Sequence, residues 1–165
     1  MKDFDKDIAY ISSISRYFAR LIKNDEYLEY IRASYSEPFC KIDVENILLF
    51  DVYDEKSFLR LIRIAKNKIL MRLVFCDLKQ IIHYEDVVDI YSYFADLVIQ
   101  KTFAFYAESF NCKKENFYII AMGKLGGQEL NVASDIDLIF AHDNDTSDNQ
   151  QVLELAKKII YALEN

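Results

Sequence analysis

Two aspartates, Asp135 and Asp137, stand one residue apart and could together bind a divalent cation. The segment that begins with them, residues 135–141, is rich in aliphatic residues, which predicts a strand. Its aliphatic side chains would share one face and both carboxylates the other. Carboxylate oxygens so placed suit Mg²⁺, and two such ions can hold the attacking and leaving oxygens of a phosphoryl transfer. An isolated Asp-X-Asp is more often a solvated turn, so the neighbouring residues decide.

A short glycine-rich segment precedes the aspartates. The three glycines of the chain are Gly123, Gly126 and Gly127. The apolar run before them, residues 117–122, predicts a buried strand that ends at the first glycine. Residues without a Cβ allow a tight turn and let backbone N–H groups approach phosphate oxygens. Lys124 would add positive charge and Ser134 a hydroxyl, so the segment predicts a phosphate-binding loop.

The glycine segment follows neither of the two common nucleotide-binding patterns. Lys124 is followed by Leu125 rather than Ser or Thr, and no glycine stands five residues before Gly123, which excludes a Walker loop. The G-x-G-x-x-G spacing of dinucleotide-binding folds is also absent. A strand, a glycine loop and an acid pair in close succession nevertheless favour a single nucleotide site.

The stretch GKLGGQELNVASDIDLIF resembles the nucleotidyltransferase signature of the glutamate-ammonia-ligase adenylyltransferase family, within the polymerase-β-like superfamily. The resemblance implies that Asp135 and Asp137 are catalytic and bind Mg²⁺, with two ions expected. It also implies that ATP or ADP is substrate or product. The expected nucleotide- and phosphate-binding residues are Lys124, Gly126, Gly127 and Ser134.

Enzymes of this family attach AMP to glutamine synthetase or remove it, using two such domains. Met122, Asn131 and Ile136 look more like the first domain, which removes AMP by phosphorolysis. The implied partners are glutamine synthetase, the nitrogen-signalling regulatory protein PII and a nucleotide. Two alternatives stay open: another nucleotidyltransferase, such as a uridylyltransferase acting on a regulatory protein, or a truncated, non-catalytic helical interaction module.

Only three glycines and one proline interrupt the chain, which favours long helices. The expected class is α+β, with a mostly helical bundle followed by a truncated nucleotidyltransferase-type sheet of two strands and a helix. We expect a helical region over residues 1–115 and the start of the catalytic core over 116–165, in one compact unit. The resemblance places a third catalytic aspartate on a later strand, beyond Asn165. The chain is therefore expected to be part of a longer enzyme and to be inactive alone.

Apolar residues at helical spacings locate the expected helices. One helix broken near residues 23–25, or two short ones, should occupy residues 5–34. The others should occupy residues 43–51 with Asp43 as N-cap, 54–79 with Asp54 as N-cap, 83–111 and 150–163. The basic residues of the third segment predict a solvated face or, as the alternative, contacts of some of them with nucleotide phosphates or an acidic partner. They are Arg60, Arg63, Lys66, Lys68 and Arg72.

Composition excludes several classes of protein. A formal net charge of −7 argues against binding a nucleic-acid backbone, which requires clustered cations. The chain has no apolar run of membrane-spanning length and its first residues are acidic, so we expect a cytoplasmic protein without a membrane anchor. Cys40, Cys76 and Cys112 show no metal-site or disulfide spacing and are expected to be free thiols.

Overall fold

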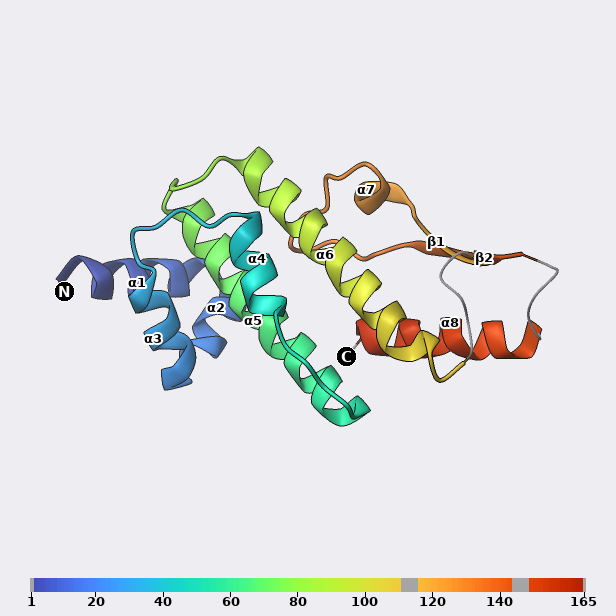
Figure 1. Cartoon of the computed structure of the whole chain (residues 1–165). Coiled ribbons are helices and arrows are strands. Elements are labelled where there is room, and N and C mark those ends of the chain that lie inside the picture. Colours follow the sequence, from blue (N-terminus) through green and yellow to red (C-terminus); the bar gives the residue numbers. More distant parts are fainter. Residues whose placement is uncertain (1, 111–115, 144–148, 165) are drawn as a thin grey trace. The chain divides into compact units, whose positions relative to one another are not determined.

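A computed structural model of the chain describes residues 2–110, 116–143 and 149–164 (Figure 1). Its class is α+β, as expected, with helices followed by a two-stranded sheet and a final helix. The elements in chain order are α1 (Lys2–Ile14), α2 (Arg16–Leu21), α3 (Asp25–Ala33), α4 (Lys41–Leu48), α5 (Glu55–Leu78), α6 (Tyr84–Ala107), β1 (Phe117–Ala121), α7 (Gly123–Gly126), β2 (Leu138–His142) and α8 (Asn149–Glu164).

Contacts divide the chain into two compact units, Met1–Ile90 and Tyr91–Asn165. The first unit contains α1 to α5 and the start of α6, and the second contains the rest of α6, both strands, α7 and α8. None of the described helices is both long and apolar enough to cross a bilayer. Cys40 and Cys76 are free thiols, as expected, and Cys112 lies outside the described residues.

In the first unit, side-chain caps decide where the short helices begin. The Asn24 side chain accepts a hydrogen bond from the Glu26 N–H at 2.9 Å and starts α3, which confirms the expected break near this residue. A second break, at Ser15, was not expected. Its hydroxyl accepts from the Phe18 N–H at 3.2 Å and starts α2. Serine competes with the helix by such local bonds, which apolar spacing alone does not reveal.

The caps of α4 and α5 were predicted with different success. The Asp54 side chain accepts from the Ser57 N–H at 2.9 Å, so its expected role as N-cap of α5 is confirmed. The expectation for Asp43 was wrong, because α4 begins at Lys41 with Cys40 as its N-cap. The Asp43 carboxylate instead accepts from the Cys40 N–H at 2.8 Å, as the third residue of a capping box does.

The helix α5 carries a buried cation that sequence reasoning placed in solvent. Arg72 is only 1% exposed, which contradicts its assignment to a solvated face. One guanidinium nitrogen donates to the Glu37 carbonyl at 2.6 Å. The guanidinium carbon lies 5.8 and 5.9 Å from the ring centres of Phe39 and Phe75. The chain around Pro38 thus covers Arg72, a tertiary contact that helical periodicity cannot predict.

Alkaline pH should destabilise the first unit through Tyr30. Burial raises the pKa of this phenol to about 12, against 10.0 for the ordinary side chain. The unfolded chain therefore releases the Tyr30 proton first, so its contribution to stability is complete below pH 10 and is lost as pH rises towards 12. Between pH 9 and 11 the loss should be about 1 kcal/mol.

Urea unfolding at several pH values would test this. The Tyr30→Phe variant should show a shallower loss of unfolding free energy above pH 10 than the parent chain. Tyr53→Phe is the matched control, because Tyr53 is 97% exposed. An identical pH dependence in the Tyr30→Phe variant and the parent would contradict the prediction.

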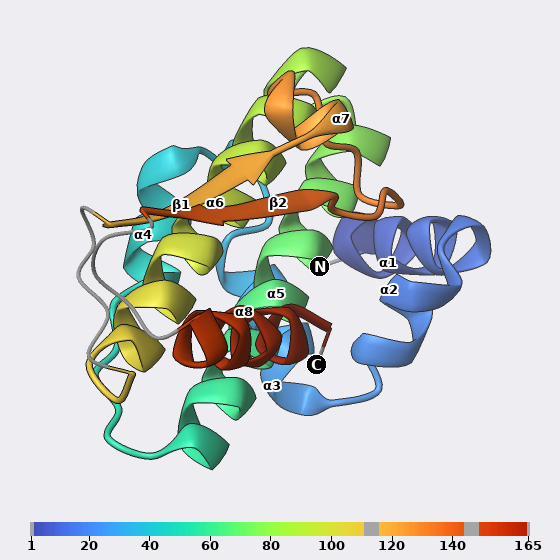
Figure 2. The same ribbon diagram turned by 90° about the vertical axis from the view of Figure 1, so that its right-hand side faces the viewer.

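In the second unit, β1 and β2 form an antiparallel pair in which Ile119 lies opposite Phe140. The strand expected at residues 117–122 is confirmed within one residue, but it is not buried, since Tyr118 and Ile120 are 46% and 48% exposed. Within this unit, α8 and the later part of α6 lie on one side of the two-stranded sheet (Figures 1 and 2). On that side Phe117 stacks on Phe103 of α6, with ring centres 5.4 Å apart. The other face is solvent-exposed.

Candidate functional site

The two aspartates lie in the segment just before β2. The strand begins at Leu138, so the expectation that Asp135 and Asp137 start it was wrong. The backbone nevertheless continues the pairing by one step, because the Met122 N–H donates to the Asp137 carbonyl at 2.9 Å. Both carboxyl-bearing residues are exposed to solvent.

The second aspartate of the pair lies beside the glycine segment. A Cβ placed on Gly123 would stand 3.5 Å from one carboxylate oxygen of Asp137. The backbone bond between Met122 and Asp137 fixes this neighbourhood, because it ties the residue before the first glycine to the second aspartate. Local pairing of the strands therefore brings the two sequence features together.

The glycine segment turns tightly, as expected for residues without a Cβ. It forms a single helical turn, α7, in which the Gly126 N–H donates to the Met122 carbonyl at 3.1 Å. The Gly127 N–H donates to the Gly123 carbonyl at 3.0 Å. Both amide groups assigned to phosphate thus already donate within the turn. A phosphate contact from these two residues stays a prediction.

Two of the glycines are required by the turn itself. Gly123 has a φ of +56°, in the left-handed region that residues with a side chain rarely adopt. Gly126 lies so close to β1 that a Cβ would stand 2.5 Å from the Ala121 carbonyl oxygen. Gly127 is less constrained, since its Cβ would meet the Glu129 side chain at 3.4 Å and the Gly123 carbonyl oxygen at 3.6 Å, both at ordinary contact distance or close to it. The glycines therefore allow the turn to pack directly against the strand.

The helix α6 holds in place the segment that follows the turn. The buried Ser92 hydroxyl accepts a hydrogen bond from the Leu130 N–H at 2.9 Å. Leu130 is itself 0% exposed, and Leu125 of α7 is buried as well. The Gln128 amide donates to the Asp96 carboxylate at 3.0 Å. Two polar bonds and two apolar side chains thus fix a segment without regular secondary structure.

A chain of polar side chains joins two of the predicted phosphate-binding residues. The Lys124 ammonium donates to the Ser134 hydroxyl at 3.1 Å, and this hydroxyl donates to the Asn131 side-chain oxygen at 2.9 Å. The same Asn131 oxygen accepts from the Ala133 N–H at 3.1 Å. Asn131 therefore fixes the conformation of the residues that lead to Asp135.

Sequence reasoning assigned no such role to Asn131 or Ser92. The Asn131 interaction with a backbone N–H two residues on is a standard asparagine turn, so the sequence held a usable signal. The Ser92 bond joins residues 38 positions apart, and no local pattern could have shown it. Both residues support the site without belonging to the predicted set.

The side chains of Asp135 and Asp137 fit a magnesium site. Neither carboxylate has a hydrogen-bond or ion-pair partner within residues 2–110, 116–143 and 149–164. In those same residues no group of three or more His, Cys, Asp or Glu side chains could enclose a metal ion. Two accessible carboxylates suit Mg²⁺, which commonly binds one or two and completes its shell with water and substrate phosphates.

Known proteins resemble almost the whole chain. A sequence family described as glutamate-ammonia ligase adenylyltransferase matches residues 6–165. The chain is similar to the bifunctional glutamine synthetase adenylyltransferase/adenylyl-removing enzyme of Nitrosomonas eutropha, with 28% identity over 93% of the chain and 20% of that protein. The proteins of the same name from Acinetobacter baylyi and Psychromonas ingrahamii are 30% and 32% identical, over 87% and 68% of the chain. The chain spans only 20%, 17% and 14% of the length of these three curated relatives, respectively.

Proposed function

We propose, because this chain belongs to the glutamate-ammonia ligase adenylyltransferase family, that it supplies the metal- and phosphate-binding part of a nucleotidyltransferase site acting on glutamine synthetase. One observation carries the proposal. The Asp137 carboxylate lies against the glycine turn, with 3.5 Å between its oxygen and a Cβ position on Gly123. The Asp137 carboxylate and the glycine turn therefore form one surface on which a nucleotide phosphate could bind, and Asp135 is two residues away along the chain.

Each residue of this surface has a definite proposed role. Asp135 and Asp137 bind Mg²⁺, and two ions are expected by analogy with the superfamily. When bound, Mg²⁺ would supply positive charge that stabilises the transferring phosphoryl group. The Lys124 ammonium and the Ser134 hydroxyl, 3.1 Å apart, bind phosphate oxygens. Gly126 and Gly127 are the further residues proposed to contact phosphate oxygens, through backbone N–H groups that already donate to the Met122 and Gly123 carbonyls within the turn.

The favoured direction of the reaction is removal of AMP. Inorganic phosphate attacks the α-phosphorus of an adenylyl group on a tyrosine of glutamine synthetase. The bond from phosphorus to the tyrosine oxygen breaks, the tyrosine recovers a proton, and ADP leaves. Addition of AMP from ATP uses the same groups, and the similar proteins carry both activities in their names. The choice of removal rests on the resemblance of Met122, Asn131 and Ile136 to the first domain of such enzymes.

In this proposal, nucleotidyl transfer requires the longer protein of which this chain is expected to be a part. Within the described residues the site offers two carboxylates, and the third is expected on a later strand. The proposed partners of the longer protein are adenylylated glutamine synthetase and the regulatory protein PII. The chain alone should bind ADP or ATP with Mg²⁺ without turning over.

Isothermal titration of the 165-residue chain would test this proposal. We expect ADP and ATP to bind in the presence of Mg²⁺ and not in the presence of a chelator. Lys124→Met should weaken nucleotide binding by about tenfold, because a charge-assisted hydrogen bond is worth roughly 1.5 to 3 kcal/mol. Preference for UTP would favour the uridylyltransferase alternative. A folded chain that binds no nucleotide would instead favour the non-catalytic module.

A further inference from the structure

The Asn131 side chain lies at the centre of a set of hydrogen bonds beside the proposed phosphate site. Its oxygen accepts from the Ala133 N–H at 3.1 Å and from the Ser134 hydroxyl at 2.9 Å. The Ser134 hydroxyl in turn accepts from the Lys124 ammonium at 3.1 Å. Asn131 and Ser134 are half-buried, whereas Lys124 is exposed. A half-buried amide is thus connected to an exposed cation through a single hydroxyl.

The chemistry of the groups fixes the direction of each of these bonds. The Ala133 N–H can only donate, so the Asn131 amide presents its oxygen here and not its nitrogen. The Lys124 ammonium can also only donate, so the single proton of the Ser134 hydroxyl goes to Asn131. One ammonium proton is used by Ser134, and two remain for a phosphate. The Asn131 oxygen therefore determines the orientation of the hydroxyl that holds Lys124.

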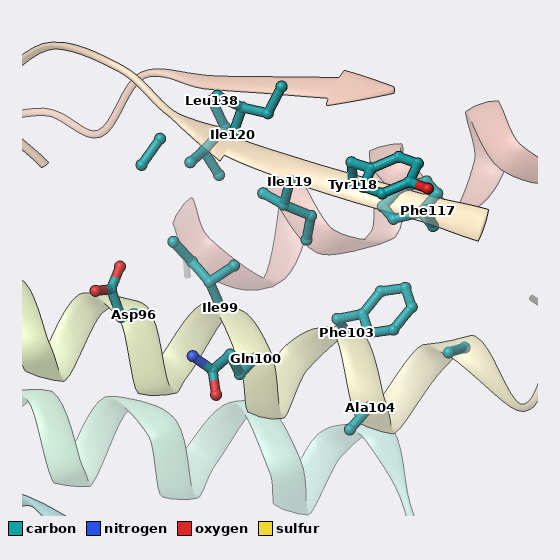
Figure 3. A pocket seen from close by; sticks show the side chains of 12 residues that line it. Asp96, Ile99, Gln100, Phe103, Ala104, Phe117, Tyr118, Ile119, Ile120 and Leu138 are labelled. Atoms are coloured by element: carbon teal, nitrogen blue, oxygen red, sulfur yellow. The ribbon is translucent and has the colours of Figure 1, made fainter. Parts of the chain in front are cut away.

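The helix α6 fixes the backbone on which Asn131 stands. The preceding residue, Leu130, is 0% exposed, and its N–H donates to the buried Ser92 hydroxyl at 2.9 Å. A second anchor is the bond from the Gln128 amide to the Asp96 carboxylate. Asp96 lines the groove between α6 and β1 and points from the helix towards the strand (Figure 3). The accepting oxygen of Asn131 is therefore attached to a well-anchored segment.

We propose that Asn131 is a positioning residue for phosphate binding, because it fixes the Lys124 ammonium through the Ser134 hydroxyl. A free lysine side chain samples many conformations, and ordering it on binding costs free energy. In this chain the hydroxyl holds the ammonium before a ligand arrives, so nucleotide binding does not bear that cost. This role rests on the proposed function and specifies how Ser134 contributes to it, which is by holding Lys124. Asn131 itself makes no contact with the nucleotide.

A double-mutant cycle in nucleotide affinity tests this role. In isothermal titration of the 165-residue chain with ADP and Mg²⁺, Asn131→Ala and Ser134→Ala should each weaken binding roughly fivefold, the worth of one ordinary hydrogen bond. In the Lys124→Met background neither substitution should weaken binding further, because the cation that they position is gone. Undiminished effects in that background would show that these residues act without Lys124 and would overturn the proposal.

Two further variants distinguish positioning from a purely structural role. Asn131→Asp keeps an oxygen that accepts from both Ala133 and Ser134. At high salt, where its added charge is screened, this variant should bind ADP as the parent does. Asn46→Ala, at an exposed position of α4, is the matched control and should leave binding unchanged. Binding by Asn131→Asp as weak as that by Asn131→Ala would contradict the role of the accepting oxygen. Circular dichroism would verify that every variant is folded.

Acetylation of lysines measures the bond between Lys124 and Ser134 without any nucleotide. An ammonium held by Ser134 must leave the hydroxyl before it reacts, so Asn131→Ala and Ser134→Ala should accelerate acetylation of Lys124 by acetic anhydride about two- to fivefold. Peptide mass spectrometry gives the rate for each lysine, and the exposed Lys6 is the internal reference. Unchanged rates at Lys124 in both variants would overturn the proposal. A chain that binds no ADP but shows these faster rates would refute the proposed nucleotide site, whereas Asn131 would still be shown to hold Lys124.

Discussion

Replacing Asp135 and Asp137 together by asparagine is expected to abolish Mg²⁺-dependent nucleotide binding and leave the fold intact. Both side chains are exposed and have no partner among the described residues, so the fold does not depend on their charge. Loss of both anionic ligands should weaken the metal-dependent binding by about a hundredfold or more, since every 1.4 kcal/mol is a factor of ten. Isothermal titration with ADP and Mg²⁺ measures the loss.

Two controls distinguish the loss of metal ligands from the loss of negative charge alone and from unfolding. Asp143→Asn removes an exposed acidic charge at the end of β2 and should leave the titration unchanged. Urea unfolding of the double variant should give a free energy within about 0.5 kcal/mol of the parent, as for other exposed substitutions. Full Mg²⁺-dependent binding by a folded double variant would refute the assignment of these aspartates.

Gly126→Ala is expected to be among the most destabilising single substitutions in the second unit. The added Cβ would stand 2.5 Å from the Ala121 carbonyl oxygen, which is a backbone atom, so relief of the clash requires a shift of β1 or of the turn that the Gly126–Met122 hydrogen bond holds. Forcing an atom into such a contact costs about 3 kcal/mol. The midpoint of thermal unfolding should fall by roughly 6 to 12 °C. Calorimetry would measure the shift.

Gly127→Ala is the matched comparison, one residue further along. Its Cβ would meet the Glu129 side chain at 3.4 Å, and this flexible side chain can move away. The unfolding temperature should therefore change little. Equal effects of the two substitutions would show that the close approach to Ala121 does not decide the role of the glycines.

The sequence predicted best what short stretches of the chain determine. The close succession of strand, glycine segment and acid pair favoured a single site, and Asp137 does lie beside the glycine turn, whereas the roles of these residues stay predictions. The sequence also predicted the Asp54 cap, because an aspartate before an apolar helix accepts a backbone N–H within a few residues. In each case the deciding interaction joins residues close together along the chain.

Where tertiary contacts decide, sequence reasoning failed. Arg72 was placed in solvent because its helical position is polar, yet the segment around Pro38 covers it. The strand at Phe117–Ala121 was expected to be buried because it is apolar, yet one face of the two-stranded sheet is exposed. The glycine segment was expected to turn tightly, and it does, but the sequence could not show which turn forms. Which conformation forms depends on the fit of Gly126 against β1.

The bond between Ser92 and Leu130 has a consequence for the order of folding. The turn at α7 closes through contacts four residues apart, and such local structure forms within microseconds. The Ser92 bond instead closes a loop of 38 residues, whose entropy must be lost before the contact is gained. The segment that approaches the aspartates can therefore settle only after α6 and the hairpin have met. During refolding, helix content should return before the site is ordered.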